Sequence, residues 1–176
     1  MYRSVAFALF AAFSVSGTTI QFPGDSLLMD IPGGWNTQKG SAPLVFLARS
    51  TTPEPTVPSP DASSFYQNLA VTRQDLSKDL RRVYEKDPVF YLEVVLYTAY
   101  ANISIFQIQR KTINGISGVY IQASLAANGT IVSNVQFYCL LGSQLYGMAF
   151  TGLSSSWQTS SIAFEKSLST LKRVGK

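Results

Sequence analysis

The sequence contains no histidine and only one cysteine, Cys139, among its 176 residues. Without histidine, the chain lacks the side chain that most often acts as a general base near neutral pH and most often ligates transition metals. A single cysteine excludes a disulfide within the chain. We therefore expect no histidine-based catalytic triad, no metal site and no cofactor, and we expect the protein not to be an enzyme.

Charged residues are also scarce, at 14% of the chain, and the net charge is only +4. A nucleic-acid interface normally shows a dense basic stripe on one face of the protein. The densest basic run here contains no block of five or six like charges, and consists of Lys78, Arg81, Arg82 and Lys86. We interpret this run as the solvated face of a helix and expect no nucleic-acid partner. Apolar residues make up 46% of the chain, which suits one globular domain with its own core.

The N-terminus has the layout of a secretory signal. Arg3 gives it a short basic start, residues 5–13 are apolar, and small residues follow at 14–17. This order predicts a signal peptide over residues 1–16 and a single mature domain over residues 17–176. The protein would then be exported, to a periplasm or to the outside of the cell, with no stable membrane span after removal of the signal. An uncleaved anchor is the alternative, although the apolar stretch is shorter than the roughly 20 residues that span a bilayer.

Most of the remaining chain has the alternating pattern of strands. The first four expected strands cover residues 20–22, 27–31, 44–48 and 66–74. Four more, at residues 103–113, 119–125, 131–141 and 145–151, are expected to form an antiparallel C-terminal meander. Asn114-Gly115 and Asn128-Gly129 are typical of tight hairpin turns, and Gly142-Ser143 turns the chain once more. The stretch from 50 to 64 carries four prolines and is expected to be a surface loop, either a connector or a mobile binding loop.

Three segments have a helical spacing of apolar residues. The first, capped by Asp75 or Ser77, would bury Leu76, Leu80, Val83 and Tyr84; the second, after the cap Asp87 and Pro88, would bury Leu92, Val95, Leu96 and Ala99. The last, capped by Ser154, Ser155 or Ser156, would bury Trp157, Phe164, Leu168 and Leu171, with Lys172, Arg173 and Lys176 at its C-terminal end. The predicted fold class is α+β, an antiparallel β-sheet with helices packed on it.

The order of these elements resembles the PsbP/Mog/DcrB-like superfamily of α/β/α sandwiches, from about Phe22 to Val174. The likeness rests on an early hairpin that ends in Pro32-Gly33-Gly34-Trp35, on residues 113–120 and 144–150, and on Phe164 and Leu168 of the closing helix. The resemblance implies binding rather than catalysis. Relatives of this fold include a lumenal subunit of photosystem II, a Ran-binding protein, a periplasmic protein and secretion chaperones, which share a scaffold and not a function. The absence of histidine sets this chain apart from the metal-binding photosynthetic members.

Tyr120, Tyr138 and Tyr146 lie in three successive strands of the meander and are the candidate binding residues. If they share a sheet face that the helices leave open, they form an aromatic patch of the kind that often binds partners. The alternative is that they pack beneath a helix. Cys139, which lies between Phe137 and Leu141 on one strand face, is expected to be a buried and unreactive thiol.

We therefore expect an exported, non-enzymatic binding or assembly factor that docks a protein partner. The alternative is a hydrolase-like enzyme with a site made of carboxylates and hydroxyls. A deep pocket that holds two carboxylates with shifted pKa values would favour the enzyme. A shallow apolar surface with aromatic residues would favour the binding protein.

Overall fold

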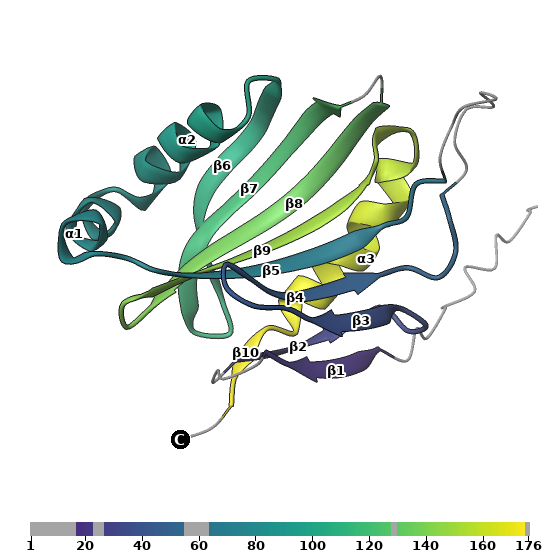
Figure 1. Cartoon of the computed structure of the whole chain (residues 1–176), viewed down its shortest axis with the longest axis horizontal. Helices are drawn as coiled ribbons and strands as arrows, with labels where there is room; N and C mark the ends of the chain where they lie inside the picture. Colours follow the sequence, from purple (N-terminus) through teal and green to yellow (C-terminus); the bar gives the residue numbers. More distant parts are fainter. Residues whose placement is uncertain (1–16, 23–26, 55–63, 128–129, 175–176) are drawn as a thin grey trace, which may run out of the picture.

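The computed structural model describes residues 17–22, 27–54, 64–127 and 130–174. Within these residues the chain forms two β-sheets, three α-helices and one short 3-10 helix (Figure 1). The predicted signal peptide, most of the proline-rich stretch and the Asn128-Gly129 turn lie outside the described residues.

The larger sheet has seven antiparallel strands in the order β3-β4-β5-β9-β8-β7-β6. In this order the strands span Asn36–Lys39, Leu44–Arg49, Asn68–Asp75, Gln144–Leu153, Thr130–Leu141, Ile116–Ala127 and Ile103–Ile113. The predicted meander, now β6 to β9, is confirmed. β3 was not expected, because all four of its residues are exposed and polar and so lack an apolar alternation.

The smaller sheet has the order β1-β2-β10 and joins the two ends of the described chain. β1 (Thr18–Gln21) and β2 (Leu27–Ile31) form the predicted early hairpin. β10 (Lys172–Arg173) pairs with β2, so the prediction that these two basic residues lie on the end of the last helix is wrong. The backbone gains ladder hydrogen bonds in this way once the helix has ended.

Helices α1 (Lys78–Lys86) and α2 (Pro88–Ala99) begin at the predicted caps. The Ser77 hydroxyl accepts a hydrogen bond from the Leu80 amide at 3.3 Å, and the Asp87 carboxylate accepts one from the Phe90 amide at 3.2 Å. Only part of each predicted apolar face is buried. The buried residues are Leu76, Tyr84, Leu92 and Leu96, whereas Leu80, Val83, Val95 and Ala99 are exposed.

Helix α3 (Trp157–Ser169) follows the 3-10 helix η1 (Ser154–Ser156). Its predicted stripe is confirmed, because Phe164, Leu168 and Leu171 are buried and Trp157 packs on Phe164. Ser156 occupies the cap position, but no serine side chain caps the helix. At the other end, the Asn114 amide of the β6–β7 turn donates to the carbonyls of Ser169 and Leu171, at 2.7 and 2.9 Å.

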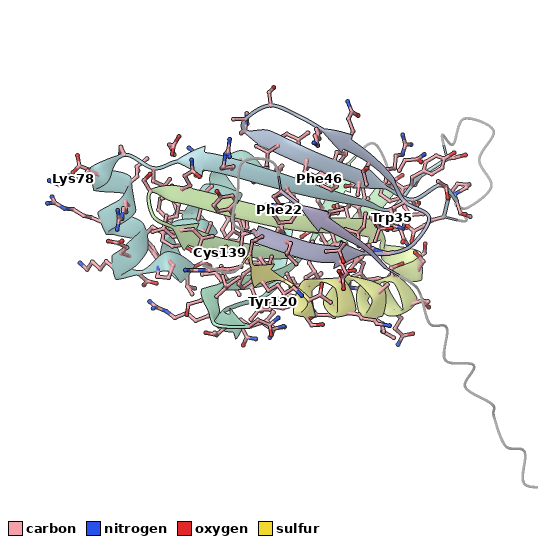
Figure 2. The ribbon with its side chains drawn as sticks, turned by 90° about the horizontal axis from the view of Figure 1, so that it is seen from below. Phe22, Trp35, Phe46, Lys78, Tyr120 and Cys139 are labelled. Atoms are coloured by element: carbon pink, nitrogen blue, oxygen red, sulfur yellow. The ribbon has the colours of Figure 1, made fainter. Side chains whose placement is uncertain are left out.

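The helices and the small sheet cover the two faces of the large sheet and create two cores. On the face that we call the α3 face, α3 and the β1–β2 hairpin bury residues that include Phe22, Leu27, Phe137, Phe150 and Phe164. On the opposite α1–α2 face, the core includes Leu92, Leu96, Val119 and Ile121. Figure 2 shows α1, with Lys78, at one end of the molecule and Trp35 at the other. This arrangement of antiparallel sheet and packed helices confirms the predicted fold class.

Candidate functional site: the tyrosines, a buried carboxylate and the outer side of α2

The three candidate tyrosines do not share one face of the sheet. Tyr120 lies opposite Phe137 and Tyr146 opposite Cys139, so both point to the α3 face, where each is 3% exposed. Tyr138 lies opposite Val119 and points to the α1–α2 face. Side chains alternate along a strand, and Tyr138 is one residue out of phase with the other two. The three tyrosines therefore do not form a single open aromatic patch.

Tyr120 belongs to a polar cluster between the β6–β7 hairpin and α3. Its hydroxyl donates a hydrogen bond to the Glu165 carboxylate and accepts one from the Gln122 amide at 2.7 Å. The Lys111 ammonium lies 3.3 Å from Glu165 and 4.1 Å from the centre of the Tyr120 ring. Burial, together with the hydrogen bond to Glu165 and its charge, raises the pKa of Tyr120. These contacts attach α3 to the edge of the sheet.

Tyr138 begins a chain of side-chain hydrogen bonds along β8. Its hydroxyl donates to Gln136 at 2.8 Å, and the Gln136 amide donates to Asn134, also at 2.8 Å. Gln136 and Asn134 are buried although both are polar. These side-chain hydrogen bonds satisfy part of the hydrogen-bonding capacity of Gln136 and Asn134 inside the protein, which lowers the free-energy cost of burying them.

The buried carboxylate of Glu54, which has serine hydroxyls beside it, is the feature most similar to the carboxylate and hydroxyl site of the enzyme alternative. One of its oxygens accepts hydrogen bonds from Gln67, Ser156 and Ser160, at 2.6, 2.6 and 3.0 Å, and the other accepts one from the Leu153 amide. Burial alone would raise the pKa of Glu54, but these four hydrogen bonds outweigh it and hold the pKa below its ordinary value. Glu54 is therefore an ionised acceptor that serves the start of α3.

The surroundings of Glu54 do not match those of a carboxylate pair. The hydrogen-bond donors on it are two hydroxyls, one side-chain amide and one backbone amide, and none is a second carboxyl group. No group of three or more metal-ligating side chains occurs in the described part of the chain. The contacts connect the segment after β4 to β9, η1 and α3, which is a structural role. No sequence pattern pointed to it, because its partners lie up to 106 residues away.

Cys139 is fully buried in the α3-face core, as predicted. Burial raises the pKa of its thiol to about 12. Since the thiolate is the reactive form of cysteine, this side chain is unsuited to nucleophilic or redox chemistry near neutral pH.

Among the described residues, the largest set of exposed apolar side chains gathers on and beside α2. Phe90, Val94 and Tyr97 are 59%, 48% and 51% exposed and follow one another at spacings of four and three residues, which places them on one side of the helix. We call this stripe, together with the exposed Val95 and Tyr100, the α2 surface. A helix that is apolar on all sides is normally buried on all sides, whereas α2 buries Leu92 and Leu96 and leaves this stripe exposed. The sequence signal was the composition of residues 88–99, which contain one charged residue, Glu93.

The charges next to the α2 surface are balanced. From Lys78 to Tyr100 there are four basic and four acidic residues. Two of the basic residues on α1 form ion pairs within that helix, Arg81 with Glu85 at 2.8 Å and Arg82 with Asp79 at 3.9 Å. This is the solvated helix face expected from the sequence. None of the helices within the described residues is long and apolar enough to cross a bilayer.

Comparison with protein-family models and with curated protein sequences finds no match. Solved structures do match. The cyanobacterial PsbP (CyanoP) of Synechocystis sp. PCC 6803 is similar with a TM-score of 0.61 at 11% identity, over 95% of this chain and 98% of that one. LpqN of Mycobacterium tuberculosis, described as involved in cell envelope biogenesis, gives 0.58 at 15% identity over 88% of both chains. A Mog1 point mutant gives 0.55 at 10% identity, over 91% and 97%.

These likenesses show the fold. The chain has the PsbP/Mog-like α+β fold that the order of its elements predicted. Because each identity lies well below 25%, the activities of these proteins do not transfer with the fold.

Proposed function

We propose that this protein is an exported, non-enzymatic binding or assembly factor that docks a protein partner through the α2 surface. The observation that carries the proposal is the exposure of Phe90, Val94 and Tyr97 on one side of α2. Exposed apolar patches of this kind are typical of protein-binding sites, and aromatic residues are enriched in them. Export rests on the basic, apolar and small-residue order of the first 17 residues.

The enzyme alternative has less support. It requires a pocket with two carboxylates, and the buried carboxylate of Glu54 has only hydrogen-bond donors around it. The groove between β2 and α3 is not such a pocket, because it holds about 80 Å³ and a single carboxyl group, that of Asp30, lines it. A pocket for a small molecule usually holds about 300 to 1,000 Å³.

Site-specific photo-crosslinking in the cells that produce the protein tests the proposal. A photoreactive amino acid replaces Val94 in one variant and Ile162 in the other; Ile162 is 70% exposed on α3 and is the matched control. We expect a discrete adduct with a protein from position 94 and none from position 162. Absence of any protein adduct at position 94, or equal adducts at both positions, would contradict the proposal.

A further inference from the structure

We infer that the protein docked on the α2 surface is a second copy of this chain, bound in an antiparallel, two-fold symmetric helix pair centred on Val94. The inference rests on the proposed function and names the partner of the same surface. Three features of α2 support it: the spacing of its exposed side chains, the amount of exposed apolar surface and the balance of charge around the helix.

The exposed stripe of α2 is nearly symmetric about Val94. Phe90 precedes Val94 by four residues and Tyr97 follows it by three, so the two aromatic rings lie at similar distances on either side of it. In a two-fold interface, a contact of residue i in one copy with residue j in the other is always matched by a contact of residue j in the first copy with residue i in the second. An antiparallel pair of α2 helices would therefore place Phe90 of each copy against Tyr97 of the other, with the two Val94 side chains near the axis. Aromatic pairs of this kind stabilise an interface beyond their buried area.

The apolar area suits a weak to moderate dimer. The α2 surface, with Leu80 and Val83 exposed on the adjoining α1, carries on the order of 500 Å² of apolar surface. With all of this surface covered, two copies would bury at most about 1,000 Å², which is close to the lower limit of specific interfaces. Homodimer interfaces are also more apolar than those between transient partners. The only charged residue of α2 is Glu93, which agrees with this composition.

The charges near α2 do not oppose an antiparallel pair. Lys86 ends α1 immediately before Asp87 and Pro88, so it lies next to the N-terminal end of α2, whereas the last turn of α2 contains no basic residue. Antiparallel pairing brings Lys86 of one copy towards the C-terminal end of α2 in the other, together with Asp87, whose carboxylate accepts a hydrogen bond from the Phe90 amide of its own helix. The helix dipole favours a positive charge at that end. The four basic and four acidic residues from 78 to 100 also prevent net repulsion between the two helix pairs.

The edge strand β6 is a less suitable route to a dimer, although it ends the large sheet and is eleven residues long. A bulge between Ile105 and Gln107 interrupts its pairing, and Arg110 and Lys111 stand near its end. Bulges and basic residues are common devices against the pairing of edge strands.

Sedimentation equilibrium of the whole chain tests the inference, with Val94→Glu and the matched control Ile162→Glu. We expect a reversible dimer for the wild-type chain and for Ile162→Glu. Val94→Glu should weaken dimerisation by more than about tenfold, because two carboxylates would meet near the axis. Residues 1–16 are common to all three chains, so a loss of dimer in Val94→Glu alone reports on position 94. Thermal unfolding checks that each variant is folded.

A covalent test uses Val94→Cys and the control Ile162→Cys. Cys139 is fully buried, so a new surface cysteine is the accessible thiol. We expect mild oxidation to yield a disulfide-linked dimer from Val94→Cys and not from Ile162→Cys, even if Val94→Glu fails to fold.

A monomeric wild-type chain at all concentrations, a dimer unaffected by Val94→Glu, or equal crosslinking of both cysteine variants would overturn the inference. So would Val94-dependent binding of a monomer to neutral phosphatidylcholine vesicles. If the chain is monomeric and position 94 photo-crosslinks to a different protein, the second copy is ruled out while the proposed function stands.

Discussion

The hydroxyl of Ser160 donates a hydrogen bond to the carboxylate of Glu54 at 3.0 Å, across 106 positions of sequence. Ser156 donates to the same oxygen at 2.6 Å. The carboxylate thus stands beside the first turns of α3, where backbone and hydroxyl donors need acceptors and where the helix dipole favours a negative charge. Glu54 does not cap α3 in the place of a serine, because the backbone amide that donates to it is that of Leu153, before η1; it holds the start of α3 through the hydroxyls of Ser156 and Ser160.

We expect Glu54→Gln to lower the free energy of unfolding by about 1 to 3 kcal/mol at neutral pH, because a neutral amide replaces a charged acceptor. The lowered pKa of Glu54 makes the folded state bind the proton less readily than the unfolded state. Its contribution is therefore complete above the ordinary glutamate pKa of 4.5 and is lost as the pH falls through the lower folded value. Urea unfolding at several pH values measures both effects. The control is Glu85→Gln on exposed α1; equal losses in the two variants at neutral pH would contradict the assignment.

Leu168 should contribute strongly to the core beneath α3. It is 1% exposed, so we expect Leu168→Ala to cost about 2 to 5 kcal/mol of unfolding free energy. The same change at Lys166, exposed on the same helix, should cost less than about 0.5 kcal/mol. Chemical denaturation of both variants makes the comparison. Matching midpoints would mean that Leu168 does not lie in the core.

Gly118 allows β7 and β8 to approach closely. A Cβ atom added there would collide with the Tyr138 carbonyl oxygen and with the ring of Phe137. We expect Gly118→Ala to lower the free energy of unfolding by about 1 to 3 kcal/mol, since backbone or a packed ring must move. The exposed neighbour Ser117 is the control. A Gly118→Ala protein that unfolds at the same denaturant concentration as Ser117→Ala would refute the close approach.

Cys139 should resist thiol reagents in the folded protein. Its side chain is fully buried and the pKa of its thiol is raised to about 12. We expect labelling only after denaturation, whereas Ser155→Cys, at an exposed position, should react rapidly under native conditions. Native labelling of the wild-type chain at the rate of that variant would be the contrary result.

The N-terminal segment should be removed on export. The sequence predicts a mature protein that begins near residue 17, and N-terminal sequencing of the exported chain tests this. Leu9→Lys should block export because it interrupts the apolar stretch, and Thr18→Lys, beyond the cleavage region, should not. A mature chain that still begins at Met1 would exclude cleavage.

The sequence by itself determined the local structure of this protein. Ser77 and Asp87 cap the helices as predicted, Asn114-Gly115 adopts the left-handed turn, and the apolar spacing of α3 predicts its buried side. These features depend on residues close in the chain, whose backbone preferences and side-chain periodicity are visible in a short window. The order of such elements was also enough to predict the fold.

Only the tertiary structure decided which elements cover each face of the sheet and of the helices. Strand alternation predicts that Tyr138 and Phe137 point to opposite faces of the sheet. The strand register was needed to show that Tyr120 and Tyr146 lie on the face of Phe137 and not on that of Tyr138. Likewise, helical spacing predicted one buried face for α2, but only Leu92 and Leu96 of that face are buried, whereas Val95 and Ala99 stay exposed. Glu54 acquired its partners by long-range packing. A sequence pattern specifies the direction of a side chain, whereas its burial depends on a surface supplied by distant parts of the chain.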